Sequence, residues 1–172
     1  NDIDTVFHLA GKLNISFSQK NKNKYFFNNF EGSKIVVRLC KKYKIKNFIF
    51  ASSCSVYGSS TKKISENKKL SPLSNYAKSK KKAEDLIIRS FLNSNISYAI
   101  LRYFNVVGAN LKDKVGEIGN NDHIIKNFSH QLQKKQSIFK IYGNNYKTSS
   151  GTCIRDYIFI EDLNYIHYRI LK

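Results

Sequence analysis

One tyrosine and one lysine in the sequence are spaced as an acid–base pair. Tyr76 and Lys80 stand in the segment Y-A-K-S-K, so on a helix they lie one turn apart. An ammonium group beside a phenol favours the phenolate, which predicts a lowered pKa for Tyr76 and a role in proton transfer. The pair alone is weak evidence, because Tyr168 and Lys172 have the same spacing.

A serine-rich segment strengthens the interpretation of Tyr76. Ser52 and Ser53 directly follow Asn47–Ala51, a continuous apolar run typical of a strand that is buried on both faces. In a parallel sheet, ligands meet the carboxyl ends of the strands, so these hydroxyl groups would face a site. A turn without a catalytic role is the alternative, since serine is common in turns. The buried strand, the two serines and a helix that opens with Tyr76 together favour catalysis.

The surrounding pattern predicts an α/β protein. The apolar segments Thr5–Leu9, Asn47–Ala51 and Ser97–Phe104 indicate strands. The amphipathic segments Tyr25–Lys42 and Ser74–Leu92 are long enough to be helices that connect parallel strands. We therefore expect a doubly wound, Rossmann-like parallel sheet. Further along the chain we expect a helix, two short strands and a second helix, at Asp122–Lys134, Ser137–Tyr142, Thr152–Ile160 and over the last dozen residues.

The sequence has no glycine-rich turn for a dinucleotide. Such a turn joins the first strand and helix of a nucleotide-binding α/β domain and seats the pyrophosphate at the helix N-terminus. The pattern G-x-x-G-x-x-G occurs nowhere in these 172 residues. Either the chain binds no dinucleotide, or the βαβ portion that carries the turn lies before Asn1.

Composition limits the function classes further. A length of 172 residues allows one modest domain, and no apolar run approaches the roughly 20 residues that cross a bilayer. The net charge of +18 comes from 25 lysines and five arginines, and the lysines are spread along the chain. This spread argues against a nucleic-acid partner, which a clustered basic surface would indicate. Three scattered cysteines without ligand spacing favour reduced thiols in a cytoplasmic setting over disulfides or a metal site.

Four further segments, taken together with the serine, tyrosine and lysine above, resemble the extended short-chain dehydrogenase/reductase family. The segment H-L-A-G at 8–11 is similar to the family's cofactor turn. The segment L-R-Y-F-N-V-V-G-A at 101–109 is similar to a segment of its epimerases. The segments Y-G-N-N-Y-K-T at 142–148 and G-T-C-I-R-D-Y-I at 151–158 are similar to stretches of the UDP-glucose 4-epimerases.

The resemblance implies a reaction and a set of site residues. The family's catalytic triad falls on Ser53, Tyr76 and Lys80, with NAD as cofactor and a UDP-sugar as substrate. The implied activity is the interconversion of UDP-galactose and UDP-glucose through a 4-keto sugar, with hydride removed from C4 and then returned. The cofactor-binding residues would be Leu9, Ala10, Gly11, Asn28, Ser53, Tyr76, Lys80 and Phe104. The substrate-binding residues would be Asn105, His123, Ile124, Tyr142 and Arg155.

The resemblance extends from Asp4 to Leu163 and implies that the chain is the central part of an epimerase. Residues 1–108 would be a partial NAD-binding domain. Residues 109–172 would begin the UDP-sugar-binding region, interleaved with the sheet in a single structural unit. The N-terminal βαβ portion and the C-terminal part of the substrate region would lie outside these residues. For the full-length protein, a homodimer and a cytoplasmic location are also implied.

Three alternatives stay open. The first is a related NAD-dependent sugar-nucleotide enzyme. A 4,6-dehydratase is disfavoured, because it would need Asp-Glu where Cys54 and Ser55 follow Ser53, whereas epimerases of N-acetylated or uronic-acid sugars remain possible. The second is a truncated, inactive remnant that keeps the triad without binding NAD. The third is a polyanion binder, which would show a steep salt dependence of nucleic-acid affinity and indifference to substitution of Tyr76.

Overall fold

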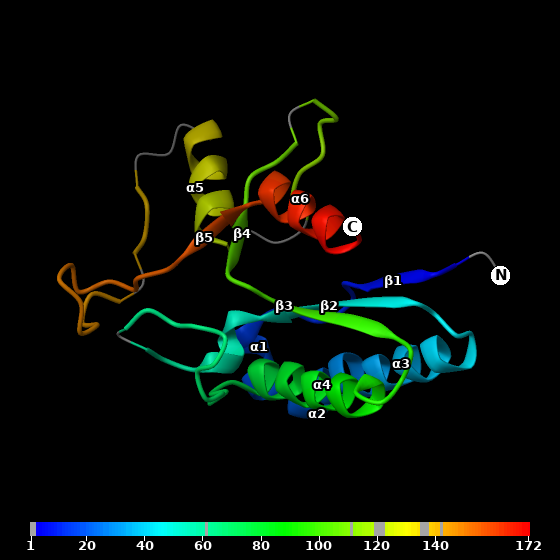
Figure 1. Ribbon diagram of the computed structural model, residues 1–172. Coiled ribbons are helices and arrows are strands. Elements are labelled where there is room, and N and C mark those ends of the chain that lie inside the picture. The colour runs from blue at the N-terminus through cyan, green and yellow to red at the C-terminus, as the bar shows by residue number, and fades with distance from the viewer. Residues whose placement is uncertain (1–2, 61, 111, 119–122, 135–137, 142) are drawn as a thin grey trace. The chain divides into compact units, whose positions relative to one another are not determined.

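The computed structural model describes residues 3–60, 62–110, 112–118, 123–134, 138–141 and 143–172 (Figure 1). The chain divides into two compact units, of which the first ends at Tyr103 and the second begins at Phe104. The sequence analysis expected a single unit with a functional boundary after residue 108. The functional assignment of the two stretches stays a prediction, and each unit is described by itself below.

A parallel sheet with the strand order β1-β2-β3 forms the centre of the first unit (Figure 1). The strands are β1 (Thr5–His8), β2 (Asn47–Ser53) and β3 (Ser97–Tyr103). Asn47 pairs with both Thr5 and Ser97, so the three strands start level and their carboxyl ends share one edge. The central strand is buried from Phe48 to Ser52. The prediction of a parallel, Rossmann-like α/β fold is confirmed.

The first connection differs from the single helix expected over Tyr25–Lys42. Four consecutive segments form it: α1 (Ile15–Lys20), α2 (Lys22–Tyr25), the π-helical η1 (Phe26–Glu31) and α3 (Gly32–Lys42). Asn14 caps the first of these, because its side-chain oxygen accepts a hydrogen bond from the Phe17 N–H at 2.7 Å. A local cap, instead of apolar periodicity, therefore sets the start, which explains why the sequence pattern placed it too late.

The second connection carries the tyrosine and lysine of the predicted triad. It runs from the 3₁₀ turn η2 (Cys54–Tyr57) through a loop to α4 (Asn75–Phe91), close to the predicted Ser74–Leu92. Ser74 caps α4, since its hydroxyl oxygen accepts a hydrogen bond from the Ala77 N–H at 3.0 Å. Both connections lie along one face of the sheet, as successive right-handed crossovers in the same direction require (Figure 1).

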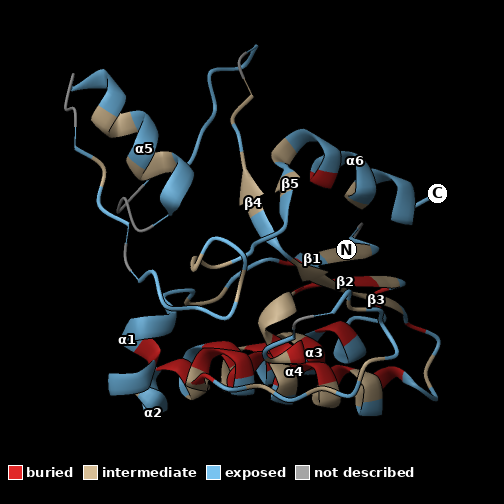
Figure 2. Cartoon of the chain, turned by 90° about the vertical axis from the view of Figure 1, so that its left-hand side faces the viewer, coloured by how far each residue is buried: buried red, intermediate tan, exposed pale blue. Residues whose placement is uncertain are grey.

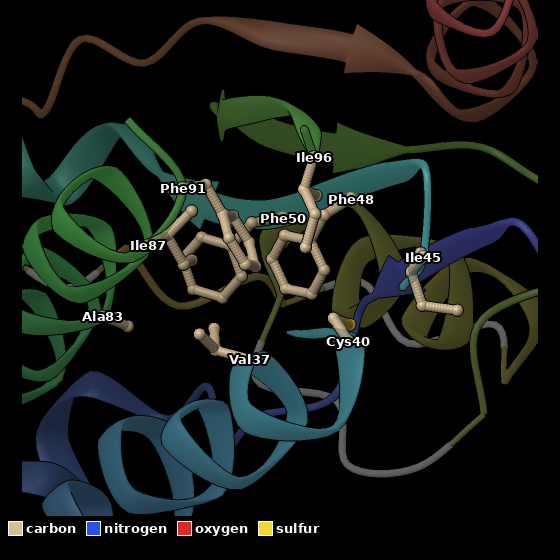
Figure 3. Close-up of a cluster of buried hydrophobic side chains, with 9 residues drawn as sticks. All are labelled: Val37, Cys40, Ile45, Phe48, Phe50, Ala83, Ile87, Phe91 and Ile96. Carbon is tan, nitrogen blue, oxygen red and sulfur yellow. The ribbon is translucent and has the colours of Figure 1, made fainter. Parts of the chain in front are cut away.

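The core of the first unit lies between its sheet and the helices α3 and α4. Figure 2 shows buried residues gathered along these two helices, and Figure 3 shows the cluster that they form with β2. Phe48 of β2 and Phe91 of α4 pack edge to face, with ring centroids 5.3 Å apart. The whole cluster comprises Val37, Cys40, Ile45, Phe48, Phe50, Ala83, Ile87, Phe91 and Ile96. Because all of these residues belong to the first unit, its own contacts hold α4 against β2.

The second unit contains a small parallel sheet and two helices. Its described elements are β4 (Asn105–Val107), α5 (Ile124–Gln133), β5 (Tyr157–Phe159) and α6 (Ile160–Ile170). β4 pairs with β5, and an ideal Cβ on Gly108, whose φ is +103°, would lie 2.2 Å from the Phe159 ring, so this close approach requires glycine. None of the helices in the described ranges combines the length and hydropathy of a membrane-spanning segment.

Two strand predictions in the second unit need correction. The strand expected over Thr152–Ile160 is confined to β5, because only Tyr157–Phe159 has a partner strand, and Ile160 already begins α6. In the strand expected over Ser137–Tyr142, residues 138–141 are not in a strand, and the two end residues lie outside the described ranges. A short apolar run predicts extended backbone, but it becomes a strand only where a neighbouring strand pairs with it.

Candidate active site

The structure brings Ser53 and Tyr76 together at the carboxyl edge of the sheet in the first unit. Ser53 is the last residue of β2 and Tyr76 lies in the first turn of α4, where the Ser53 side chain is close enough to act on the pKa of the Tyr76 phenol. Lys80 lies one turn further along α4, and its Nζ donates a hydrogen bond to the Ala51 carbonyl at 2.8 Å. Both α4 residues are enclosed, with 5% of Tyr76 and 2% of Lys80 exposed.

The Ser53 hydroxyl is oriented by its own turn. It accepts hydrogen bonds from the backbone N–H of Ser55 at 3.2 Å and from the Ser55 hydroxyl at 2.9 Å. These contacts cap the turn η2, so the same side chain ends the strand and starts the turn. Serine and short turns recur together for this reason. The serine-rich segment thus has a structural role and also places one hydroxyl against Tyr76.

Burial reverses the predicted effect on the Tyr76 phenol. The pKa of Tyr76 is raised, chiefly because burial penalises the phenolate, and the hydrogen bond from Ser53 opposes this only in part. The expectation that the lysine lowers this pKa toward neutrality is therefore wrong for the protein by itself. Burial also lowers the pKa of Lys80 to about 8, with the negative charge of Glu84 acting in the opposite direction.

The turn after β1 is fastened to α4 by Asn29, which the sequence analysis did not single out. The Asn29 side chain accepts a hydrogen bond from the Lys12 N–H at 2.7 Å and donates to the Lys12 carbonyl at 3.0 Å. It also donates to the Ser79 hydroxyl at 3.1 Å. An ideal Cβ on Gly11 would lie 3.2 Å from the Lys80 Nζ and 3.3 Å from the Asn29 oxygen. The glycine thus leaves room for both side chains.

Asn29 belongs to the π-helical segment η1, a kind of distortion that is frequent at functional sites. Its neighbour Asn28, predicted to bind the cofactor, is exposed. The sequence analysis did not distinguish the buried Asn29 from the adjacent, exposed Asn28. Asn29 lies on the same buried face as Tyr25 and Ser33, four residues before and after it, whereas Asn28 lies off that face.

His8, at the carboxyl end of β1, is buried and held in a single tautomer. Its Nε2 lies 2.9 Å from the Ser33 hydroxyl, which itself donates to the Asn29 carbonyl at 2.6 Å. Since the serine proton is used, Nε2 carries the hydrogen and donates it. Burial, followed by the charge of Lys80, lowers the pKa of His8 to about 4, so the imidazole is neutral near pH 7.

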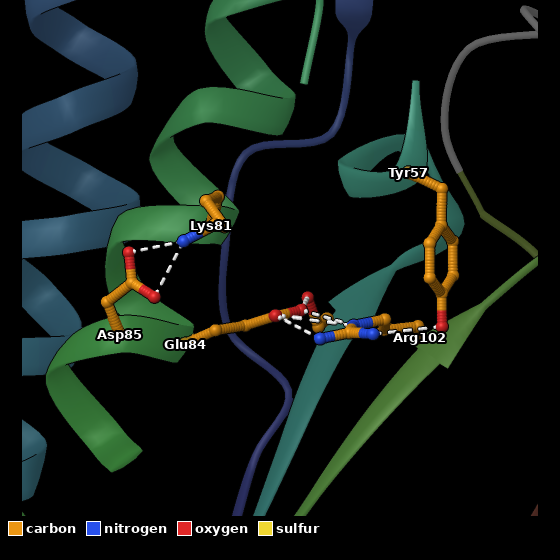
Figure 4. Close-up of polar contacts among 6 residues, drawn as sticks. Tyr57, Lys81, Glu84, Asp85 and Arg102 are labelled. Carbon is orange, nitrogen blue, oxygen red and sulfur yellow. Dashed lines mark hydrogen bonds and ion pairs between the residues drawn. The ribbon is translucent and has the colours of Figure 1, made fainter. Parts of the chain in front are cut away.

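A buried polar cluster lies next to the predicted triad (Figure 4). Arg102 of β3 donates to Glu84 of α4 through Nε at 3.1 Å and through Nη2 at 2.8 Å. Its Nη1 donates to the Tyr57 hydroxyl at 2.9 Å. The Ser52 hydroxyl also donates to Glu84. The sequence analysis expected the Ser52 hydroxyl to face the site but assigned no role to Tyr57, Glu84 or Arg102, although Glu84 follows Tyr76 and Lys80 in the same row of residues four apart on α4.

The remaining cofactor-binding predictions fall on accessible positions. Leu9 and Ala10 directly follow β1 and are exposed. Phe104, the first residue of the second unit, is also exposed. These positions are therefore reachable by a ligand.

The predicted substrate residues belong to the second unit, and the described ones are largely exposed. Asn105 is tied to the neighbouring strand, because its Nδ2 donates to the Asp156 carbonyl at 2.8 Å. Arg155, next to that carbonyl, is exposed. His123 pairs with Glu117 at 2.8 Å and directly precedes Ile124 at the start of α5. The fifth predicted residue, Tyr142, lies outside the described ranges.

Comparison with known proteins shows the same fold and similar sequences. The chain is 34% identical to the putative UDP-arabinose 4-epimerase 4 of Arabidopsis thaliana, covering 100% of this chain and 41% of the relative. It is 33% identical to the UDP-glucose 4-epimerase of Lactobacillus helveticus, covering 99% and 52%. The crystal structure of UDP-glucose 4-epimerase from Brucella ovis in complex with NAD matches with a TM-score of 0.88 at 32% identity, covering 96% and 51%.

The chain thus spans about half the length of the curated relatives that it matches. A family model, described as the NAD dependent epimerase/dehydratase family, matches residues 1–172. The match includes the turn after β1, the end of β2 and the start of α4, where the candidate residues lie. This chain belongs to the NAD-dependent epimerase/dehydratase family.

Proposed function

We propose that the chain is the central part of an NAD-dependent UDP-sugar 4-epimerase that interconverts UDP-galactose and UDP-glucose. The observation that carries the proposal is the placement of Tyr76 and Lys80, both buried one turn apart on α4, at the end of β2, where Ser53 is the last residue and the Ala51 carbonyl accepts a hydrogen bond from Lys80. In a member of this family, that arrangement provides a hydroxyl pair and a cation where C4 of a sugar can be oxidised and reduced. An epimerase is an isomerase, so the reaction regenerates its cofactor in each cycle.

The residues at the sheet edge fit the nicotinamide end of NAD. The Lys80 ammonium has three N–H donors, and within the described residues one of them is used, by the Ala51 carbonyl. Gly11 keeps the space beside this ammonium free of a side chain. When bound, NAD supplies a reversible hydride acceptor for C4 of the sugar. Leu9, Ala10, Gly11, Asn28 and Phe104 are proposed to line the cofactor together with the triad.

Each member of the triad has a distinct task in the proposed reaction. Tyr76 takes the proton of the sugar 4-hydroxyl, and Ser53 holds the 4-oxygen through its hydroxyl. Because burial raises the pKa of the phenol, Tyr76 needs a positive charge beside it to act as a base. The Lys80 ammonium supplies that charge. When the 4-keto sugar has turned over, Tyr76 returns the proton to the oxygen.

The second unit is proposed to hold the UDP-sugar. Arg155 suits a diphosphate, since a guanidinium group can donate to two oxygens at once, and its exposure leaves it available. Asn105, His123, Ile124 and Tyr142 are assigned to the same ligand by the resemblance alone. Residues 1–108 would then serve the cofactor and residues 109–172 the substrate. A homodimer is likewise part of the proposal, as is a cytoplasmic location, for which the three free cysteines are the support.

The relatives named above differ in the sugar that their names give. The relative with the highest identity quoted above is named a UDP-arabinose 4-epimerase, and the next is named a UDP-glucose 4-epimerase. The same C4 chemistry serves a pentose and a hexose. The assay must therefore include UDP-arabinose beside UDP-galactose and UDP-glucose.

The test uses the complete native chain, purified and then denatured to release and quantify bound NAD. Turnover of the three UDP-sugars is measured for the unsubstituted protein, for Tyr76→Phe, and for the control Tyr43→Phe at an exposed tyrosine. Retained NAD, with turnover lost only in Tyr76→Phe, supports the proposal. A folded protein without NAD and without turnover would contradict it and leave the inactive remnant as the answer.

A further inference from the structure

Glu84 is a buried carboxylate to which the proposed function gives no task. Its side chain is 1% exposed, and it stands on α4 one turn after Lys80. Removing a carboxylate from water is strongly unfavourable unless opposite charge and hydrogen bonds compensate for it. Arg102 and Ser52 provide both, and the hydrogen bonds to Glu84 raise the pKa of Arg102, so the guanidinium stays charged.

The partners of Glu84 come from the segments that carry the proposed triad. Ser52 directly precedes Ser53 on β2, so its hydrogen bond to Glu84 joins the end of that strand to α4. Arg102 joins α4 to β3, and through the Tyr57 hydroxyl it also reaches the last residue of the turn that follows Ser53. The cluster therefore ties together the strand end, the turn and the helix on which the triad stands (Figure 4).

Glu84 also lies close to the Lys80 ammonium, because the two residues are one turn apart on α4 and their polar ends reach adjacent residues of β2, Ser52 and Ala51. From β3, the charged group is Arg102, which faces Glu84. From β2, the Phe50 ring lies 4.8 Å below Nζ and the Ala51 carbonyl accepts its hydrogen bond. From β1, the titratable group is His8, which is neutral near pH 7. On α4 the other titratable neighbour is Tyr76, and η1 contributes the uncharged Asn29 amide. Burial favours loss of the Lys80 proton, and Glu84 opposes that loss.

We propose that Glu84 is a positioning residue: held in place by Arg102 and Ser52, it keeps Lys80 charged beside Tyr76. This inference rests on the proposed function, because it assigns Glu84 a task only if Lys80 and Tyr76 work together. Without the carboxylate, the enclosed lysine would lose its proton near neutral pH. The positive charge that the Tyr76 phenolate requires would then be absent.

The test is a pH titration of Lys80 in the complete native chain, followed by NMR of ¹³C-labelled lysine side chains. The Lys80 signal is assigned by its disappearance in Lys80→Met. In Glu84→Gln, which keeps the shape and a hydrogen-bond acceptor for Ser52, the proton affinity of Lys80 is expected to fall about tenfold or more. The matched control is Asp85→Asn, because Asp85 is the adjacent carboxylate but pairs with Lys81 at the surface, at 2.6 Å. The control is expected to leave the Lys80 titration unchanged.

A second variant covers the possibility that Glu84→Gln is poorly folded because it leaves Arg102 without its partner. The double variant Glu84→Gln, Arg102→Met removes both charges, a replacement that proteins often tolerate well. The double variant is expected to fold. Because it also lacks the positive charge of Arg102, its Lys80 titration is compared with that of Arg102→Met, which differs from it only in keeping the carboxylate, and the proton affinity of Lys80 is expected to be lower in the double variant. Equal Lys80 titrations in these two folded proteins would overturn the inference and leave the pair a purely structural role.

The titration separates this inference from the proposed function, because it needs neither NAD nor a UDP-sugar. If the chain shows no turnover but Glu84→Gln still weakens the proton affinity of Lys80, the proposed function is rejected and the effect of Glu84 on Lys80 stands. If the chain shows turnover but Glu84→Gln leaves the proton affinity of Lys80 unchanged, the proposed function stands and the role of Glu84 is rejected.

Discussion

The two units of the chain differ in how they hold the residues predicted to do chemistry. In the first unit, Tyr76 and Lys80 are enclosed and lie among buried polar partners. In the second unit, Leu163 is the one residue that is buried among those the structure describes, and the substrate candidates Asn105, His123 and Arg155 are exposed. The first unit therefore encloses its candidate groups among buried partners, whereas the candidates of the second unit lie at its surface with partners that are close in the chain or on the neighbouring strand.

The largest expected difference concerns packing. Phe91 of the first unit is 1% exposed and packs on Phe48, so Phe91→Ala should lower the free energy of unfolding by about 3–5 kcal/mol. Phe128 of the second unit is 45% exposed and has an edge-to-face contact with Phe139, so Phe128→Ala should cost about 1 kcal/mol. Urea denaturation followed by circular dichroism measures both. If Phe91→Ala and Phe128→Ala lowered the free energy of unfolding equally, the two units would not differ in packing as described.

The next effect is the pH dependence that His8 imposes on the first unit. The folded protein holds the pKa of His8 at about 4, against 6.5 in the unfolded chain. Between these values the unfolded chain binds more protons, so stability is fully present above pH 6.5 and falls as the pH drops toward 4. The loss should reach about 3 kcal/mol.

Denaturation curves between pH 4 and pH 7 test this prediction, with His8→Gln as the comparison. The glutamine cannot titrate but can still donate to Ser33, so its stability should vary much less with pH. The same steep loss of stability in both proteins would assign the effect to other groups.

A smaller effect is expected from the asparagine that fastens the turn after β1 to α4. Asn29→Ala leaves the Lys12 backbone groups and the Ser79 hydroxyl without this partner, and it should cost about 2 kcal/mol. The adjacent Asn28 is exposed, so Asn28→Ala should change stability by less than about 0.5 kcal/mol. Thermal or urea unfolding of the two variants compares them directly. If the costs were reversed, the π-helical placement of Asn29 would be wrong.

The smallest effect on stability is expected in the second unit. Arg155 is exposed, and among the described residues its side chain donates to the adjacent Ile154 carbonyl, at 3.2 Å, so Arg155→Ala should change stability by less than about 0.5 kcal/mol. If it binds the diphosphate as proposed, the same variant should weaken UDP affinity at least about tenfold. Calorimetric titration of the complete native chain with UDP measures this. Unchanged affinity would remove Arg155 from the proposed site while leaving the first unit unaffected.

Sequence patterns predicted helices and strands correctly where a long periodic or continuous apolar segment packs against the core of the first unit. The strands of the first sheet and the helix α4 were predicted closely, since their apolar residues face one core. The patterns failed for the start of the first connection and for Ser137–Tyr142. In the first case a single capping residue, Asn14, determines the boundary, and in the second no partner strand accompanies residues 138–141. The apolar pattern of a short segment shows neither where a capping residue starts a helix nor whether a partner strand is present.

The sequence predicted which residues form the candidate site, but it did not predict the direction in which the pKa of Tyr76 is shifted. The spacing of Tyr76 and Lys80 and the serines after a buried strand indicated which groups would meet. The direction of the Tyr76 pKa was predicted wrongly, because burial raises this pKa by more than the Ser53 side chain lowers it. Burial depends on everything that packs around a side chain, and spacing along the chain does not contain it.

The sequence by itself determined the alternation of strands and helices, and with it the meeting of Ser53, Tyr76 and Lys80 at one edge of a parallel sheet. Local periodicity is sufficient for this, since right-handed crossovers leave few other arrangements. Only the tertiary structure decided that Asn29 instead of Asn28 is buried and that Glu84 meets Arg102 and Ser52 in the interior. Those contacts join residues far apart in the chain, and their strength comes from the exclusion of water, which exists only once the core has formed.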